Sequence, residues 1–340
     1  MKKKLLGVID ATYKGDLEEL IIERSLAAVP FAGRYRLIDF VLSSMVNSGI
    51  KSVALFPKYQ YHSLMDHLGS GRNWDLNRKR DGLFLFPPQL FDLPNGGNSF
   101  DQFAAHLSFF KRSSQEYTLV ANCFTVANID FRTILDAHID ADCDITELRH
   151  EGKSMDMYLL KTSLLIELLE NHEKTGFTSM NDVVHSLNHD YKVCYYQFKG
   201  YAVMVDSVKK YYETSMEFLQ PAIWKKFFQK DQPIFTKVMD EPPTLYAKEA
   251  SIQNSMIANG CQIDGRVENS IIARGVKVGK NTVIKNSVIL QKCEISDNCI
   301  LENVILDKDV IIESGRRIRV SPDAPKILRK DTVQGALMNS

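Results

Sequence analysis

The chain has 340 residues, of which 44% are hydrophobic and 25% are charged, enough to bury the cores of two domains. Lysine and arginine together number 42, as do aspartate and glutamate, so the formal net charge is zero. This balance excludes the basic footprint of a nucleic-acid-binding protein and a polybasic membrane patch. No apolar stretch approaches the length that spans a bilayer, so we expect no membrane insertion.

The cysteines and the first residues bear on the cell compartment. The six cysteines are scattered and form no C-x-x-C pair, the spacing typical of metal and redox sites. The apolar run that begins at Leu5 is interrupted at Asp10, which is too early for the core of a signal peptide. We therefore expect a cytoplasmic protein with reduced cysteines.

In chain order, the first two-thirds alternate short apolar runs with amphipathic patterns. Strand-like apolar runs cover residues 5–9, 52–56, 118–121, 155–160 and 191–198. Apolar residues at helical spacing cover residues 36–47, 61–68 and 163–172. Because strands alternate with helices, the pattern predicts an α/β domain of Rossmann-like type, with a mostly parallel sheet covered on both faces.

The character of the chain changes at residues 229–244, where three prolines indicate a linker. Four similar blocks follow it, beginning at Asn254, Asn269, Asn286 and Asn303, with spacings of 15, 17 and 17 residues. Apolar residues recur about every six positions within the blocks, which predicts a left-handed parallel β-helix; the fixed period fits an antiparallel sandwich poorly. We thus predict a first domain over 1–228, a linker over 229–244 and a β-helix over 245–340.

Several segments resemble the glucose-1-phosphate adenylyltransferase family. Residues 28–40 read AVPFAGRYRLIDF, close to the family segment PAVPFGGKYRIIDF. The similarity continues through residues 47–50, 62–69, 242–261 and 307–310, and so covers nearly the whole chain. The resemblance implies a nucleotidyltransferase domain followed by a left-handed β-helix. In this family, the phosphate of glucose 1-phosphate attacks the α-phosphate of ATP, giving ADP-glucose and pyrophosphate.

The resemblance also locates the phosphate loop, where this chain departs from the family. The family reads G-G-x-G-[TS]-R-L, whereas Ala11 and Thr12 here replace the paired glycines. Their side chains hinder the close approach of backbone N–H groups to a phosphate. The catalytic arginine of the family becomes Asp16, whose carboxylate would repel a triphosphate. The lysine of the family motif R-A-K-P becomes Leu26, so a second phosphate-binding cation is missing.

The two aspartates that hold Mg²⁺ in the family are also replaced. The first, in S-G-D-H, aligns with Phe124, and the second, in G-Y-W-[KR]-D-V, aligns with Met204. Neither side chain offers the hard oxygen ligand that Mg²⁺ requires. Asp206, two residues beyond Met204 on a strand, would point to the same side and is the one candidate substitute.

Active members further carry a longer stretch before the strand over 155–160, with an E-K-P lysine that holds the sugar phosphate. Here only a turn's length separates the strand that follows Asp144 from the next one, and no E-K-P occurs. With losses confined to one site, the chain resembles the short, non-catalytic GlgD-type subunit of bacterial glycogen synthesis. We expect no cofactor and no metal, and a catalytic glucose-1-phosphate adenylyltransferase subunit as partner in a hetero-oligomer, by expectation a tetramer.

A few residues and the overall function each allow a second interpretation. Arg34, Arg36 and Lys58 are a candidate anion site for a small-molecule effector, against the alternative of structural or solvent-facing pairs. Phe100, near the position of a nucleotide-contacting family motif, is a candidate for base stacking or for packing. A weakly active nucleotidyltransferase is the alternative function. A hexapeptide acyltransferase is disfavoured because no histidine follows His189.

Overall fold

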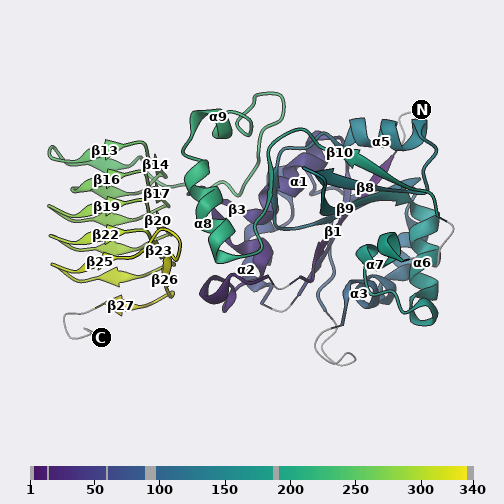
Figure 1. Cartoon of the computed structure of the whole chain (residues 1–340), viewed down its shortest axis with the longest axis horizontal. Coiled ribbons are helices and arrows are strands. Elements are labelled where there is room, and N and C mark those ends of the chain that lie inside the picture. The colour runs from purple at the N-terminus through teal and green to yellow at the C-terminus, as the bar shows by residue number, and fades with distance from the viewer. Residues whose placement is uncertain (1–3, 14, 59, 89–96, 187–190, 335–340) are drawn as a thin grey trace.

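A seven-stranded sheet forms the centre of the first domain (Figure 1). The computed structural model describes residues 4–13, 15–58, 60–88, 97–186 and 191–334. The strands lie in the order β10-β8-β9-β6-β1-β4-β5. Their bounds are β1 (Leu5–Ala11), β4 (Ser52–Pro57), β5 (Gly82–Leu85), β6 (Tyr117–Asn122), β8 (Ile145–His150), β9 (Lys153–Lys161) and β10 (Val193–Gln197). Only β9 runs antiparallel to its neighbours, β6 and β8, so the predicted mostly parallel sheet is confirmed.

Helices cover both faces of this sheet. Ile9 on β1 belongs to the hydrophobic cluster under α1, α2, α5 and α8, whereas Val8 belongs to the opposite cluster under α3, α4, α6 and α7. This alternation follows from the two-residue period of a strand, so a central strand that is buried on both faces reads as a continuous apolar run. The helices are α1 (Leu37–Asn47), α2 (His62–Leu68), α3 (Ser99–Ala105), α4 (Leu107–Arg112), α5 (Phe131–Asp140), α6 (Thr162–Thr175), α7 (Met180–His185), α8 (Val208–Glu217) and α9 (Pro221–Trp224).

Shorter elements surround the sheet. Strands β2 (Pro30–Phe31) and β3 (Tyr35–Arg36) form one antiparallel pair, and β7 (Thr125–Ala127) and β11 (Ala202–Met204) form another. Three short 3-10 helices, η1 (Glu18–Ile21), η2 (Leu26–Ala28) and η3 (Arg72–Trp74), lie in the loops. Between α9 and the first strand of the second domain, the chain forms no further helix or strand.

The second domain is the parallel β-helix that the repeat predicted. Three parallel ladders of short strands stack along it (Figure 1). The first ladder holds β12 (Leu245–Tyr246), β15 (Gln262–Ile263), β18 (Lys277–Val278), β21 (Glu294–Ile295), β24 (Ile311–Ile312) and β27 (Val333–Gln334). The second holds β13 (Ser251–Gln253), β16 (Arg266–Glu268), β19 (Val283–Lys285), β22 (Ile300–Glu302) and β25 (Arg317–Arg319). The third holds β14 (Met256–Ile257), β17 (Ile271–Ile272), β20 (Val288–Ile289), β23 (Val304–Leu306) and β26 (Lys326–Leu328).

The asparagines that mark the repeat sit at equivalent corners of successive coils. Asn254, Asn269, Asn286 and Asn303 all have positive φ, between 43° and 58°. Asparagine tolerates this left-handed conformation better than other non-glycine residues, which explains its recurrence in the sequence. The chain turns there into the third ladder, whose strands face the first domain (Figure 1).

The two domains share one hydrophobic core. Val288, Ile305 and Ile327 of the third ladder belong to the same buried cluster as α1 and α8 of the first domain. The hydroxyl of Tyr212 on α8 donates a hydrogen bond to the backbone oxygen of Asn286 at 2.6 Å. The β-helix is therefore packed against the first domain along its length and is not merely tethered to it.

One cysteine pair differs from the sequence-based expectation of reduced thiols. Cys143 and Cys194 form a disulfide with a Cα–Cα distance of 6.1 Å, although 51 residues separate them in the sequence. The parallel pairing of β10 with β8 places Cys194 opposite Thr146 and so brings the two cysteines together. The expectation is wrong for this pair, because strand order cannot be read from cysteine spacing. The other four cysteines are buried thiols.

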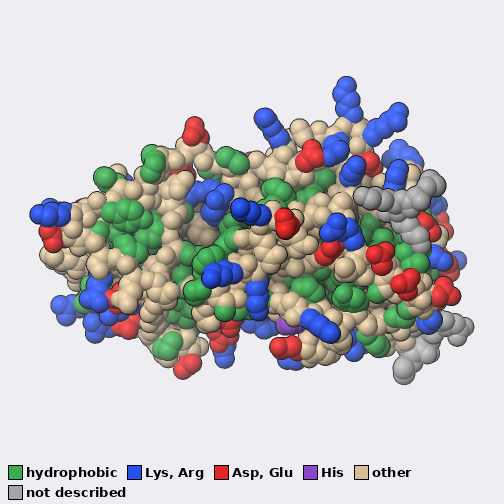
Figure 2. Space-filling model, turned by 90° about the horizontal axis from the view of Figure 1, so that it is seen from above, with side chains coloured by type: hydrophobic (Ala, Val, Ile, Leu, Met, Phe, Trp, Pro, Cys, Tyr) green, Lys and Arg blue, Asp and Glu red, His purple; other side chains and the backbone are tan. Residues whose placement is uncertain are grey.

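The surface carries both signs of charge. Figure 2 shows basic and acidic side chains interspersed over the face that it displays, in keeping with the zero net charge. No helix in the described part of the chain combines the length and the apolar character that a membrane crossing requires.

Candidate functional site

Three loops converge where the resemblance places a catalytic site. A backbone hydrogen bond holds the loop after β1 beside the segment that follows β11: Asp16 N–H donates to the Asp206 oxygen at 2.7 Å. A second backbone hydrogen bond holds the segment after β6 beside the same part of the chain: Val205 N–H donates to the Phe124 oxygen at 3.0 Å. The framework thus brings together the positions of Asp16, Phe124 and Met204, which lie far apart in the sequence.

The side chains at the phosphate loop do not favour an anion. Asp16 is exposed and holds a carboxylate where the family has a guanidinium. Leu26 is 2% exposed, and a Cβ atom added at Gly15 would lie 3.0 Å from its Cδ2 atom. The leucine therefore fills the space behind the loop as part of the hydrophobic core. Neither position can stabilise the negative charge that develops in phosphoryl transfer.

Apolar packing occupies the positions of the magnesium ligands. Phe124 is 3% exposed, and its ring contacts the ring of Tyr13 with centroids 5.0 Å apart. Met204 pairs with Thr125 across β11 and β7, and its half-buried side chain packs against the main core. Two carboxylates are thus replaced by two packed apolar side chains, and the site has been refilled as core.

Asp206 does not restore the metal site. Its carboxylate forms an ion pair with Lys210, one turn into α8, with an N–O distance of 2.9 Å. Within the described ranges, no group of three or more His, Cys, Asp and Glu side chains is placed to hold a metal ion. The residues present therefore do not fit Mg²⁺, which prefers several oxygen ligands in octahedral geometry.

A cavity of about 430 Å³ remains beside the refilled site. Phe124 and Tyr13 line one part of it, and Asp10 and Asp156 line another. None of the described residues in its wall is a lysine or an arginine. Burial raises the pKa of Asp156, and the nearby carboxylates of Glu147 and Asp10 act in the same direction. A cavity wall that contains two carboxyl groups and, among its described residues, no lysine or arginine is unfavourable for a triphosphate.

Two further sequence-based predictions about this region can be compared with the structure. The segment between β8 and β9 is a tight turn at Glu151 and Gly152, both with positive φ, so this chain has no longer sugar-phosphate loop at this place. Phe100 is fully buried between Phe103 and the other rings of the second hydrophobic cluster, and it does not line the cavity. Its role is packing and not base stacking.

The candidate effector cations are only partly brought together. Arg36 donates to the backbone oxygen and hydroxyl of Ser63, at 2.5 and 2.9 Å, and burial lowers its pKa to about 10. Arg34 is exposed and lies over the ring of Tyr35. Lys58 directly follows β4, its backbone N–H donates to the Ala11 oxygen at 3.1 Å, and among the described residues the structure records no interaction between it and either arginine. Arg36 therefore has a structural role.

Comparison with known proteins places the chain in a family. Residues 17–154 match the nucleotidyl transferase family, and residues 242–334 match the GlmU-like C-terminal hexapeptide family. The glycogen biosynthesis protein GlgD of Bacillus subtilis (strain 168) is 50% identical over 339 residues, 99% of each chain. GlgD of Geobacillus stearothermophilus is 54% identical over 342 residues, the whole of both chains.

The chain belongs to the GlgD family of glycogen biosynthesis proteins. Glucose-1-phosphate adenylyltransferases are more distant relatives; that of Bacillus anthracis is 28% identical over 360 residues, 94% of this chain and 95% of the relative. The resemblance inferred from the motifs is thereby confirmed at the level of the family.

In this member of the GlgD family, sequence reasoning missed three cations whose charges interact with Arg36. Arg24, Arg274 and Lys308 come from three distant segments; after burial, the charges of Arg24 and Arg274 help to lower the pKa of Arg36 at the domain junction. Burial, together with the positive charges of Arg36 and Arg24, lowers the pKa of Lys308 to about 8. No local sequence motif predicts that these residues lie close together, because they meet only when the β-helix packs on the first domain.

Proposed function

We propose that this chain is a non-catalytic, regulatory or structural subunit of glucose-1-phosphate adenylyltransferase in glycogen biosynthesis, acting in the cytoplasm. The observation that carries the proposal is the refilled site, with Phe124 and Met204 in place of magnesium ligands and Asp16 in place of a cation. The surrounding framework is intact, which supports selection for the fold without selection for catalysis. The proposal includes no metal and no cofactor.

Such a subunit acts by assembling with a catalytic homologue, and we propose a hetero-oligomer, with a tetramer as the expected form. Its effect on the partner must come from contacts that differ between the partner's conformational states. Apolar side chains on the linker and first coil support an assembly role: Val238 is 74% exposed and Leu245 is 67% exposed. Leu245 lies on β12, which ends its ladder and leaves one strand edge unpaired among the described residues.

The decisive experiment compares the purified chain with a mixture. ADP-glucose formation is measured with ATP, Mg²⁺ and glucose 1-phosphate, first for this chain alone and then with a catalytic adenylyltransferase homologue. We expect no turnover by the chain alone, and a changed rate or substrate affinity in the mixture. Steady production of ADP-glucose by the chain alone would instead establish the alternative, a weakly active nucleotidyltransferase, for which the cavity beside Phe124 leaves space.

The native mass of the two co-expressed proteins tests the assembly separately. A single species that contains both chains supports the hetero-oligomer, and its mass gives the stoichiometry. Two species that each contain one kind of chain contradict it. A small-molecule effector also belongs to the proposal, but Arg36 would have to leave Ser63 to bind one at the predicted position.

A further inference from the structure

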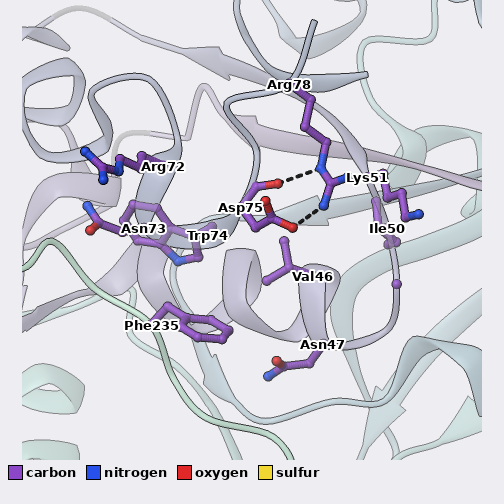
Figure 3. Close-up of a pocket in the computed structure, with 11 residues that line it drawn as sticks. Val46, Asn47, Ile50, Lys51, Arg72, Asn73, Trp74, Asp75, Arg78 and Phe235 are labelled. Atoms are coloured by element: carbon purple, nitrogen blue, oxygen red, sulfur yellow. Dashed lines mark hydrogen bonds and ion pairs between the residues drawn. The ribbon is translucent and has the colours of Figure 1, made fainter. Parts of the chain in front are cut away.

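A second cavity of about 430 Å³ lies outside the refilled catalytic site. It opens where α1 ends, beside η3, and the interdomain linker passes along one wall (Figure 3). Val46 and Asn47 come from α1, Trp74 from η3, and Phe235 from the linker. Three segments that are distant in the sequence therefore form one enclosure, none of which takes part in the degenerate site.

The charge of this cavity is positive. Lys51, Arg72 and Arg78 line it, whereas Asp75 is its one carboxylate among the described residues. Asp75 is already neutralised, because Arg78 donates to its backbone oxygen at 2.8 Å and to its carboxylate. Figure 3 shows Arg72 and Lys51 on opposite sides of the cavity, with the Arg78–Asp75 pair beside Lys51. Arg72 and Lys51 are exposed, and no ion pair engages either of them in the described structure.

The wall between these cations is apolar and aromatic. Phe235 and Val46 are half-buried and present hydrophobic surface to the cavity. Trp74 is 1% exposed, and its indole N–H is buried without a hydrogen-bond partner in the described structure. The indole ring therefore adds to the wall between Lys51 and Arg72.

Hydrogen bonds to α1 hold the linker residues that form part of the cavity wall. Phe235 N–H donates to the hydroxyl of Ser43 at 2.8 Å, and the Asn47 side-chain amide donates to the Pro233 oxygen at 3.0 Å. These bonds hold Phe235 against α1, so the cavity is formed before any ligand arrives. A preformed cavity that combines an apolar wall with polar side chains at its rim is suited to a small amphipathic molecule.

We propose that this cavity binds a small organic phosphate, with its apolar part against Phe235 and Val46 and its phosphate held by an unpaired cation at the rim, Lys51 on one side or Arg72 on the other. Lys51 and Arg72 supply long, mobile cations without competing carboxylates, and these recognise phosphate through charge-assisted hydrogen bonds. The inference does not depend on the chain being non-catalytic, since it concerns a different part of the molecule.

The test uses the tryptophan in the wall as its reporter. The chain has only two tryptophans, so Trp224→Phe leaves Trp74 as the single emitter. This variant is titrated with phenyl phosphate, with phenol and with inorganic phosphate. We expect a saturable change in emission with phenyl phosphate, and affinities at least about tenfold weaker for phenol and for inorganic phosphate, since each lacks one of the two interactions.

A matched pair of variants locates the site. Lys51→Ala with Arg72→Ala removes the unpaired rim cations, and we expect it to weaken phenyl phosphate binding at least about tenfold. Lys79→Ala with Arg80→Ala removes two exposed cations that do not line the cavity, and binding should be unchanged. Equal losses in both variants, unaltered binding in the first, or no saturable signal up to about 10 mM phenyl phosphate would each overturn the proposal.

Discussion

At the residue scale, the packing of Phe124 and Met204 bears on whether two substitutions could create a magnesium site. Phe124 is 3% exposed and packed against Tyr13, so Phe124→Asp would place a carboxylate in a volume that is filled by a ring. Ala11 and Thr12 still obstruct the phosphate loop, and the tight turn between β8 and β9 still lacks the sugar-phosphate segment. The differences from the adenylyltransferase motifs are therefore distributed over several positions.

We predict that Phe124→Asp combined with Met204→Asp forms no ADP-glucose from ATP, Mg²⁺ and glucose 1-phosphate. The same double variant should lose about 3–5 kcal/mol of unfolding free energy, because a packed aromatic side chain is removed from the core. Phe124→Leu with Met204→Leu is the control, and its loss should be markedly smaller. Mg²⁺-dependent product formation by the aspartate variant would show that the rest of the site is competent after all.

Lys308 gives a prediction about pH at the domain junction. Its folded-state pKa of about 8 lies below the ordinary 10.5, so the unfolded chain binds more protons between these two values. The unfolding free energy contributed by this group therefore rises with pH above about 8, and the cost of the buried ammonium is fully present below it.

We expect Lys308→Met to raise the unfolding free energy at pH 7 by about 1–3 kcal/mol, because the variant buries no charge. At pH 9 this advantage should shrink by about 1 kcal/mol. Urea denaturation at the two pH values measures both quantities. The Lys277→Met variant, at an exposed position, serves as control and should show no such pH-dependent difference. If the difference in unfolding free energy between Lys308→Met and the unaltered chain stays constant with pH, the pKa of Lys308 is not lowered in the folded chain.

At the element scale, a serine ladder supports the corner of the β-helix. Ser287 is buried; its hydroxyl donates to the Lys285 oxygen at 2.6 Å and accepts from Val304 N–H at 3.2 Å. Its own N–H donates to the hydroxyl of Ser270 one coil earlier, at 3.0 Å. Each of these serine hydroxyls thus accepts from a backbone N–H of the next coil, that of Ser287 or of Val304.

We predict that Ser287→Ala costs about 1–3 kcal/mol of unfolding free energy, since it leaves the buried N–H of Val304 without its hydroxyl acceptor. Ser255 occupies the equivalent corner of the outer coil, where water can replace its hydroxyl, so Ser255→Ala should cost less than about 1 kcal/mol. Chemical denaturation of the two variants gives the comparison. Equal costs would show that burial does not matter at this corner.

The elements also show what the sequence could predict. Strand β4 and helix α1 were predicted to within one residue at each end, because an apolar run and a helical spacing are local signals. The antiparallel direction of β9 was not predicted, since a buried strand reads alike in either direction. Asp156 in the cavity was also missed, although a carboxylate inside an apolar strand is a signal that could have been noticed.

At the scale of the whole molecule, the two domains are joined by a buried ion pair as well as by a common core. Arg24 is 3% exposed and Asp307, in the β-helix, is 1% exposed; an Arg24 guanidinium nitrogen lies 2.8 Å from an Asp307 carboxylate oxygen. Removing one partner of such a pair leaves the other charge buried and uncompensated. Because the pair bridges the domains, its loss should weaken their coupling.

We predict that Arg24→Ala lowers the unfolding free energy by about 3–5 kcal/mol, and that adding Asp307→Asn recovers part of this loss. Arg329→Ala is the control, since its pair with Glu19 spans the same two domains at the surface and is worth at most about 1 kcal/mol. The domains can be followed separately, because both tryptophans lie in the first domain and three buried thiols, Cys261, Cys293 and Cys299, lie in the β-helix.

In the unaltered chain, loss of tryptophan emission and labelling of the three β-helix thiols should share one transition, because the domains are stabilised by the same core. In Arg24→Ala the two transitions should separate, with the thiols reporting their own midpoint. If they coincide in this variant too, the shared hydrophobic core alone couples the domains. If they are separate already in the unaltered chain, the domains unfold independently, and a signal could not pass between them through this junction.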